Sequence, residues 1–420
     1  MKVAILGGTG RFGSALARRL TEAGVEVTIG SRDPERAAAA VAGELSSGTF
    51  TAVPGETPEL RARHGAVVRA VEPIADGPGG TRIARVAIDV PPDNLEPSLP
   101  QLLATLAGNV FELRDPVALR LVDFALPEEL ERAFPGPAFG APGTRRLSGV
   151  EGRPLIGTIV KPSVGLSPQD TGALVAELAD AGVDFVKDDE LIGDPPYSPL
   201  ARRIACVRGA LRRVEQRTGR RVAYAPNVSG GVEHMLRGAE LAAAEGAGAA
   251  MVCVHAVGLA GVLELRRREL LPLHGHRAGW GLLGRGASAL GPAAHARIWR
   301  LAGVDQLHVG GLRSKFFEAD ASVAAALAAC RAPGPHPPVM PVLSAGQWGE
   351  QLRDTVAAAG GPDFVYLAGG AIVGHPHGIA GGVRALRAAA EGAAAGRTIE
   401  QLAPDVPELA ASLTAFGGVR

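Results

Sequence analysis

Cysteine is scarce in this sequence: Cys206, Cys253 and Cys330 are the only three among 420 residues. Three widely spaced thiols are too few for a disulfide framework and too scattered for a thiolate metal site, so we expect a reducing, cytoplasmic setting. Net charge is also lacking, because 43 basic residues balance 43 acidic ones. This balance excludes a global field that would attract nucleic acid or an anionic membrane.

Long apolar runs are absent as well. No stretch of about 18 apolar residues is found, and the N-terminus lacks the apolar core and cleavage site of a signal peptide. The composition is nevertheless 46% hydrophobic, which is enough for a large core. We expect a soluble globular protein whose length suits one barrel and a smaller domain.

A glycine-rich motif opens the chain. Residues 3–6 read as a strand, 7–13 (GGTGRFG) as a tight turn, 14–23 as a helix and 25–29 as a second strand. This is the first half of a dinucleotide-binding βαβ unit. A dinucleotide needs two such halves, and the alternation stops after Arg32, so a structural extension over 1–24 is favoured over NADP binding.

Two further regions follow this extension. Residues 25–149 mix strands and helices, including a helix over 33–45, a strand over 82–89 and a helix over 99–107, which predicts a modest α+β domain of ferredoxin-like type. After a Pro/Gly-rich linker, short β-branched runs alternate with alanine-rich helices. Eight such runs predict a (β/α)8 barrel over 150–395, with a helical tail over 396–420; the runs are 155–160, 183–186, 222–226, 249–254, 271–273, 306–309, 339–343 and 364–367.

Polar side chains gather where this fold places an active site, at the ends of the strands. The second run ends in Lys187-Asp188-Asp189-Glu190. Strand alternation puts Lys187 and Asp189 on one face, and Glu190 can join them where the strand turns. Carboxylates suit Mg²⁺, but a lysine among them is explained only if it balances charge or becomes an anionic ligand. A solvated acidic turn is the alternative.

The other strand ends carry groups suited to anions. Gly369-Gly370 after the eighth run and Ala345-Gly346 after the seventh resemble in composition a phosphate cradle of backbone N–H groups. Arg277 with His308 suits a second anionic group. The set predicts a phosphorylated, oxygen-rich small molecule and chemistry through an enediolate.

Several of these motifs together resemble the large subunit of RuBisCO, and most closely the RuBisCO-like proteins. They are GTIVKPSVGLS (157–167), DFVKDDE (184–190), HGHR (274–277), GGLRSK (310–315), PVLSAG (341–346) and GGAIVGHP (369–376). The resemblance implies that Lys187 is carbamylated by CO₂ and binds Mg²⁺ with Asp189 and Glu190. It further implies that Lys161 is the acid/base lysine and that Lys315 lies on a mobile loop.

The resemblance also implies substrate-binding and partner residues. Arg277, His308 and Ser344 match one phosphate or anion site, and His276 lies beside it. Thr49, Gly346, Gly369 and Gly370 match the other. Glu44, Thr49 and Asn109 would reach the barrel of a neighbouring subunit, which implies a homodimer or a multiple of dimers.

Departures from the family pattern narrow the function. Ser163 stands where carboxylating enzymes have a second lysine, and Phe50, Trp280 and Gln306 are also exchanged. These changes argue against ribulose bisphosphate carboxylation. The motifs resemble the branch of 3-oxo-isoapionate 4-phosphate decarboxylases, although Ala345 and Ala371 differ there. The alternatives are an enolase or isomerase of a methylthio-sugar phosphate, and a non-catalytic scaffold or NADP-binding fusion.

Overall fold

The computed structural model describes residues 23–49 and 51–417, and its contacts divide the chain into two units. The first unit comprises residues up to Gly136 together with Trp280–Leu301 and Pro333–His336. The second unit comprises Pro137–Gly279, Ala302–Ala332 and Pro337–Arg420. The predicted GGTGRFG turn lies outside the described residues.

The first unit is built on a five-stranded sheet in the order β10-β4-β1-β3-β2. Its strands are β1 (Ala23–Ser31), β2 (Val67–Asp76), β3 (Arg82–Val90), β4 (Ala118–Ala125) and β10 (Ala289–Leu290). β1 pairs antiparallel with β3 on one edge and with β4 on the other, and β10 adds to β4 in parallel. β1 is therefore a central strand, which explains why its side chains are buried on both faces.

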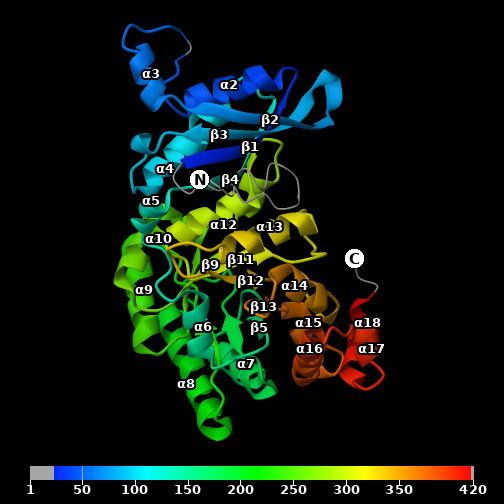
Figure 1. Ribbon diagram of the computed structural model, residues 1–420. Helices are drawn as coiled ribbons and strands as arrows, with labels where there is room; N and C mark the ends of the chain where they lie inside the picture. The colour runs from blue at the N-terminus through cyan, green and yellow to red at the C-terminus, as the bar shows by residue number, and fades with distance from the viewer. Residues whose placement is uncertain (1–22, 50, 418–420) are drawn as a thin grey trace. The chain divides into compact units, whose positions relative to one another are not determined.

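Helices of the first unit cover or extend this sheet (Figure 1). α2 (Pro34–Glu44) begins where the Asp33 carboxylate accepts from the Arg36 N–H, and its alanine-rich face packs on β1, β2 and β3. α4 (Leu99–Ala107) has the bounds expected from the sequence. The others are α3 (Pro58–His64), η1 (Pro78–Gly80), η2 (Pro92–Asn94), η3 (Asn109–Glu112), α5 (Glu128–Arg132), α11 (Trp280–Gly284) and α12 (Pro292–Leu301).

The second unit is an eight-stranded parallel barrel. Its strands are β5 (Leu155–Ile159), β6 (Phe185–Lys187), β7 (Ala223–Ala225), β8 (Ala250–Cys253), β9 (Leu273–His276), β11 (Gln306–Gly310), β12 (Met340–Leu343) and β13 (Val365–Leu367). The sheet order β7-β6-β5-β13-β12-β11-β9-β8 follows the chain, and the Asn227–Met251 bridge links its two ends. All eight predicted strands are present, so the predicted barrel with a smaller α+β domain is confirmed.

Helices follow the barrel strands along the chain (Figure 1). α7 shows the local logic: Ser167 caps its first turn, Pro168 occupies the first helical position, and Gly182 ends it in the left-handed region at φ 100°. The helices of this unit are α6 (Gly140–Ser148), α7 (Pro168–Ala181), α8 (Leu200–Thr218), α9 (Val232–Ala244), α10 (Val254–Arg268), α13 (Asp320–Arg331), η4 (Gly349–Gln351), α14 (Leu352–Ala359), α15 (Gly369–Val373), α16 (Gly378–Ala394), α17 (Ile399–Leu402) and α18 (Pro407–Phe416).

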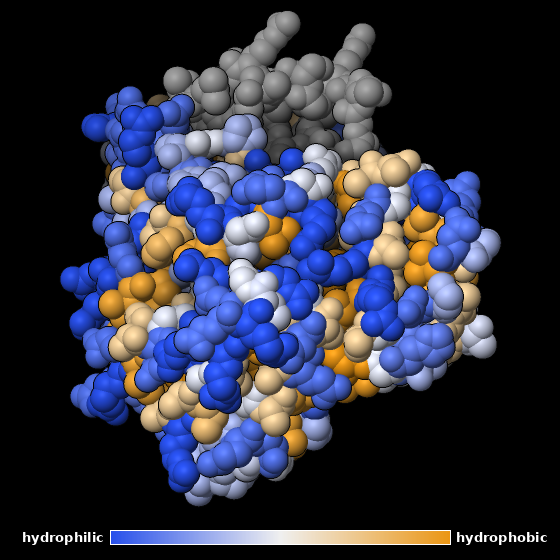
Figure 2. All heavy atoms as spheres, turned by 90° about the horizontal axis from the view of Figure 1, so that it is seen from below, coloured by the Kyte–Doolittle hydropathy of each residue, from blue (hydrophilic) through white to orange (hydrophobic). Residues whose placement is uncertain are grey.

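Apolar side chains of the strands fill the barrel, including Leu155, Phe185, Met251, Val342 and Val365, all fully buried. Each of these parallel strands is buried on both of its faces, which explains why the sequence shows continuous β-branched runs without alternation. On the face drawn in Figure 2, hydrophilic side chains separate smaller hydrophobic groups. Among the described helices, none combines the length and apolarity needed to cross a bilayer.

Candidate active site

The acidic run at the end of β6 separates into two faces, as strand alternation predicts. Lys187 and Asp189 face the barrel end, where Lys187 Nζ lies 3.6 Å from Glu190 Oε2. Asp188 points the other way and is fully buried. There it accepts hydrogen bonds from Arg203 Nε at 3.0 Å and from the Tyr224 hydroxyl at 2.7 Å. The buried contacts of Asp188 hold the strand end, which leaves its neighbours to form the site.

Lys161, just after β5, joins this acidic group. Its Nζ donates to Asp189 Oδ2 at 2.6 Å and to Ser163 Oγ at 2.7 Å. Ser163, which stands where carboxylating enzymes have a second lysine, thus places a neutral hydroxyl beside Lys161. Lys161 is part-exposed, whereas Asp189 is almost fully buried, so the amine faces the open side.

The pKa shifts of Lys187 and Asp189 are those expected of residues that could hold a cation. Burial lowers the pKa of Lys187, against the raising effect of Glu190 and Asp189. Burial is the largest single effect on Asp189 and raises its pKa, but the hydrogen bonds from Lys161 and the Leu191 N–H, together with the charges of Lys161 and Lys187, outweigh it, so the pKa falls. A lowered pKa increases the neutral fraction of the Lys187 amine, which is the form that reacts with CO₂, and the carboxylates of Asp189 and Glu190 lie near enough to interact with it. The residues therefore fit Mg²⁺ with a carbamate on Lys187, although the described residues contain no ready cluster of three His, Cys, Asp or Glu ligands.

Three histidines lie together on β9 and β11, next to Glu190. His274 and His276 lie in β9, beyond the predicted strand end at 273, and His308 lies in β11, within the predicted run 306–309. His274 Nε2 is 2.9 Å from His308 Nε2, and His276 Nε2 is 3.4 Å from Glu190 Oε2. Burial is the main cause that lowers the pKa of His274 to about 3 and those of His276 and His308 well below the ordinary value. All three imidazoles are therefore neutral at physiological pH.

Arg277 is already paired in this structure. Its Nη1 donates to Glu318 Oε1 at 3.1 Å, and its Nη2 binds the other carboxylate oxygen. The pair lies over Gly310, at the end of β11, where a Cβ would come within 2.6 Å of Arg277 Nη2. The guanidinium expected to meet an anion thus already has a carboxylate partner, which the sequence did not predict.

The glycines predicted to hold phosphate lie at the ends of β12 and β13. Gly346 adopts φ 77°, which favours glycine, and a Cβ there would stand 3.8 Å from the Lys315 backbone N. A Cβ on Gly370 would meet nothing within 4 Å, whereas one on Gly369 would touch Ile159 at 3.3 Å. Open space over Gly370 and the close Lys315 backbone are compatible with a phosphate at this point.

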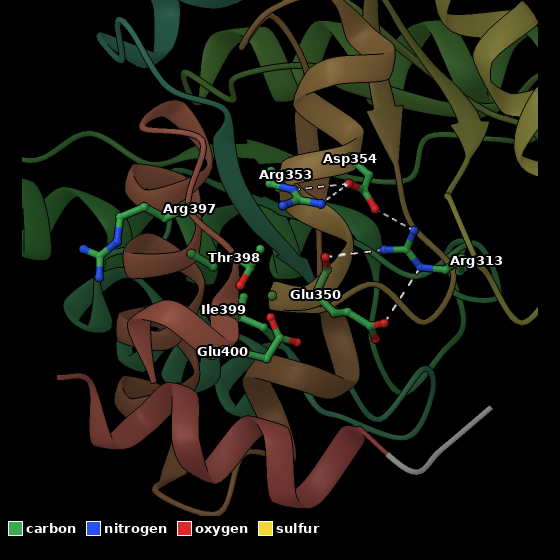
Figure 3. Close-up of a pocket in the computed structure, with 10 residues that line it drawn as sticks. Arg313, Glu350, Arg353, Asp354, Arg397, Thr398, Ile399 and Glu400 are labelled. Atoms are coloured by element: carbon green, nitrogen blue, oxygen red, sulfur yellow. Dashed lines mark hydrogen bonds and ion pairs between the residues drawn. The ribbon is translucent and has the colours of Figure 1, made fainter. Parts of the chain in front are cut away.

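The loop that carries Lys315 is fixed at its base by Arg313. Arg313 Nη1 donates to Asp354 Oδ2 at 2.8 Å and Nη2 donates to the Glu350 carbonyl at 3.4 Å (Figure 3). Its own backbone N–H donates to Asp320 Oδ1 at 2.7 Å. These contacts tie the loop to α13, η4 and α14 beside a cavity of about 350 Å³, also lined by Arg353 and Arg397.

Glu44, Thr49 and Asn109 lie in the first unit, apart in sequence from the barrel residues. Glu44 is the last residue of α2, Thr49 follows in the loop and bonds the Thr51 carbonyl, and Asn109 begins η3. All three are exposed. Their predicted contact with a neighbouring subunit stays a prediction.

Two contributors to the site escaped sequence reasoning. Thr144, in the region read as a linker, lies in α6 and receives a hydrogen bond from Gln306 Nε2 at 3.1 Å. Glu318 reaches Arg277 from the loop after β11. Neither residue stands at the end of a barrel strand, where the polar site residues were expected. The segment Trp280–Leu301 groups with the first unit, although it lies within the sequence range of the predicted barrel.

Comparison with known proteins gives consistent matches over nearly the whole chain. Residues 141–416 match the family described as ribulose bisphosphate carboxylase large chain, catalytic domain, and residues 29–130 match its N-terminal domain. A 3-oxo-isoapionate-4-phosphate transcarboxylase/hydrolase of Xanthobacter autotrophicus is 47% identical, with 91% of this chain and 95% of that protein covered.

A 3-oxo-isoapionate-4-phosphate decarboxylase of Rhizobium etli is 41% identical, with 90% of this chain and 94% of that protein covered. The crystal structure of a rubisco-like protein from Burkholderia fungorum has a TM-score of 0.86 and 37% identity, and covers 94% of this chain and 99% of its own. Both sequence and structure therefore relate the two units to the same set of proteins.

Proposed function

Because the chain belongs to the ribulose bisphosphate carboxylase large-chain family, we propose that it is a RuBisCO-like lyase that releases CO₂ from a phosphorylated 3-oxo sugar acid. The substrate we propose is 3-oxo-isoapionate 4-phosphate or a close relative, in line with similar proteins of that name at 41–47% identity. Family membership agrees with the resemblance seen in the motifs.

One observation carries the choice of decarboxylation: Lys161 donates to the neutral Ser163 and to Asp189 within the acidic group. A carboxylating site would aim a second positive charge at its intermediate, and Ser163 supplies none. A single ammonium beside the reacting carbon suffices to protonate the product of CO₂ loss.

Lys187, as its carbamate, would hold Mg²⁺ together with Asp189 and Glu190. The bound ion would polarise the carbonyl β to the carboxylate, which makes that carbonyl a better electron acceptor. When the bond to the carboxylate breaks, its electron pair moves to the former keto oxygen, and CO₂ leaves. Lys161 then donates its proton to the adjacent carbon, and His276 holds Glu190 in place through a neutral imidazole.

The remaining residues would bind the substrate and the partner subunit. Gly346, Gly369 and Gly370 are suited to one phosphate, and Lys315 would cover it from the loop after β11. Glu44, Thr49 and Asn109 are exposed in the first unit, so a homodimer in which they complete a neighbouring site is part of the proposal.

The decisive experiment uses 3-oxo-isoapionate 4-phosphate labelled with ¹³C in its carboxylate, in D₂O with Mg²⁺ and bicarbonate. Decarboxylation releases labelled CO₂ and places one deuterium on the product. If the label stays in an organic acid formed by carbon–carbon cleavage, the result would instead favour a transcarboxylase or hydrolase activity. The relative at 47% identity is named for these two activities. Deuterium exchange without CO₂ would favour the enolase or isomerase alternative, and carboxylation of ribulose bisphosphate above background would contradict the proposal.

A further inference from the structure

Five side chains of the second unit form a continuous row of hydrogen bonds that ends in the site. Gln306 Nε2 is 3.1 Å from Thr144 Oγ1, and Gln306 Oε1 is 2.9 Å from His274 Nδ1. His274 Nε2 is 2.9 Å from His308 Nε2, and His308 Nδ1 is 3.2 Å from Ser344 Oγ. Thr144, Gln306, His274 and His308 are at most 3% exposed, so water does not compete for these contacts.

The direction of each hydrogen bond follows from Thr144. Its hydroxyl donates to the Gly140 carbonyl at 3.0 Å, which uses its one proton. Gln306 must therefore present its NH₂ group to Thr144 and its carbonyl oxygen to His274. A carbonyl oxygen only accepts, so His274 carries its proton on Nδ1 and leaves Nε2 as an acceptor.

The same reasoning passes through the second imidazole. His274 Nε2 accepts, so His308 donates from Nε2 and leaves its own Nδ1 without a proton. Ser344 then donates its hydroxyl proton to His308 Nδ1. In this arrangement each imidazole carries a single proton, so both rings must be neutral. Burial, which lowers the pKa of both histidines, favours the neutral form.

The row leaves lone pairs facing the substrate. Ser344 has given its proton to His308, so its remaining capacity is to accept a hydrogen bond. A phosphate dianion only accepts, and it would find no donor in Ser344 or His308. The nearby Arg277 is paired with Glu318 through both carboxylate oxygens, and that pair is nearly buried, so its charge is already balanced.

We propose that Gln306, oriented by Thr144, fixes the tautomers of His274 and His308 so that Ser344 accepts a hydrogen bond from a substrate hydroxyl and this subsite excludes a second phosphate. This revises the sequence-based expectation that Arg277, His308 and Ser344 bind an anion. The inference rests on the proposed function for the placement of the substrate. It narrows the substrate class to monophosphates that carry a free hydroxyl at the end opposite the phosphate, where the substrate would meet Ser344. Gln306 and Thr144 are positioning residues, since they act through the histidines.

The first test reads the tautomers directly. In full-length protein labelled with ¹⁵N-histidine, long-range ¹H–¹⁵N spectra should show His274 protonated on Nδ1 and His308 protonated on Nε2. Gln306→Leu removes the acceptor that faces His274 and should disturb both tautomers. Thr144→Val removes the partner that orients the amide, and mixed tautomers are expected. A wild-type spectrum with His274 protonated on Nε2 overturns the proposal.

The second test compares two probes that differ only at the far end, ribulose 5-phosphate and ribulose 1,5-bisphosphate, by calorimetry with the Mg²⁺- and bicarbonate-treated protein. The monophosphate should bind at least about tenfold more tightly, because a second phosphate leaves buried acceptors unpaired. Glu318→Gln, which removes the carboxylate paired with Arg277, should narrow that ratio, and so should Gln306→Leu, which removes the acceptor that fixes the tautomers. Equal or tighter binding of the bisphosphate by the wild type contradicts the proposal.

Failure of this inference can be separated from failure of the proposed function. Both tests measure spectra or binding and need no turnover. Release of labelled CO₂ without a monophosphate preference would reject the subsite assignment alone. A monophosphate preference without CO₂ release would reject the reaction alone.

Discussion

Lys161 Nζ lies 2.6 Å from Asp189 Oδ2, which joins the amine after β5 to the carboxylate after β6. The two residues are 28 positions apart in sequence, and adjacent parallel strands bring them together. The contact gives Lys161 a fixed position beside the group proposed to hold Mg²⁺. Its removal should therefore affect chemistry more than binding.

Lys161→Met should lose the protonation step while it keeps the metal. We expect turnover to fall by about 10²- to 10⁴-fold, which is the usual contribution of a general acid. Mg²⁺ affinity measured by calorimetry should stay the same or rise, because a cation leaves Asp189. Ser163→Ala removes the other partner of Lys161 and is the matched control, with a smaller loss. Full activity of the Lys161→Met enzyme would show that another group supplies the proton.

Lys187→Ala should abolish metal binding and turnover together. CO₂ can convert the buried Lys187 amine, whose pKa is lowered by burial, into an anionic ligand, so both CO₂ and Mg²⁺ should be required for activity. Mass spectrometry after trapping of the carbamate, and activity with and without bicarbonate, provide the measurements. Lys161→Met is the internal comparison, since it should lose turnover alone. Activity of Lys187→Ala without added metal would contradict the carbamate assignment.

Local patterns predicted most of what positions this site. The opposite directions of Asp188 and Asp189 follow from strand alternation, and the eight β-branched runs mark strands that are buried on both faces. β2 was missed because it is an edge strand: most of its residues are exposed, and Arg69, Glu72 and Pro73 interrupt any alternation.

The contacts of Gln306 could not be predicted by the same means. A glutamine within a buried strand has no periodic signature, and its orientation depends on Thr144, which is 162 positions away in sequence. Glu318 likewise meets Arg277 across 41 positions. The sequence therefore predicts which polar groups stand at the strand ends. The partners of these groups and the direction of their hydrogen bonds become clear only from the folded structure.

Glu26 should make stability depend on pH. Burial is the main cause that raises its pKa from 4.5 to about 7, against the lowering effect of Arg85, 3.0 Å away. The folded chain thus binds more protons than the unfolded chain between these values, so the free energy of unfolding falls as pH rises from about 4.5 to about 7. The loss amounts to about 3 kcal/mol at most.

Glu26→Gln should remove this dependence, because an amide fits the same place without a charge. Urea unfolding at pH 8 should show a gain of about 1–3 kcal/mol over the wild type, and the two proteins should agree near pH 4.5. Glu35→Gln, at an exposed position of α2, is the control and should change stability little. An equal gain at both pH values would show that Glu26 is not protonated in the folded state.

Deletion of residues 1–22 should leave catalysis nearly intact. A dinucleotide-binding βαβ unit needs a parallel neighbour for the strand at 25–29, yet that segment lies in β1, which pairs antiparallel on both edges. Steady-state kinetics of the truncated protein test this expectation, although solubility is expected to suffer. Tight NADPH binding by the full chain, lost on Gly8→Ala or Gly10→Ala, would support the fusion alternative instead.

Arg313→Ala should loosen the loop that carries Lys315 without unfolding the barrel. Arg313 is part-exposed, so the lost ion pair with Asp354 should change the free energy of unfolding by less than about 1 kcal/mol. The loop, however, loses its link to η4 and α14, so hydrogen exchange over residues 311–319 should speed up. We expect kcat/KM to fall about tenfold, mainly through KM, because Lys315 is then held less often over the substrate.

Arg353→Ala is the matched control for this prediction. Arg353 contacts the same Asp354, at 3.3 Å, but belongs to α14 and not to the loop of Lys315 (Figure 3). Its loss removes a comparable surface charge while the Arg313 contacts remain, so exchange over 311–319 and kcat/KM should stay near the wild-type values. Equal effects of the two substitutions would mean that surface charge around the cavity, and not the anchoring of the loop by Arg313, governs activity.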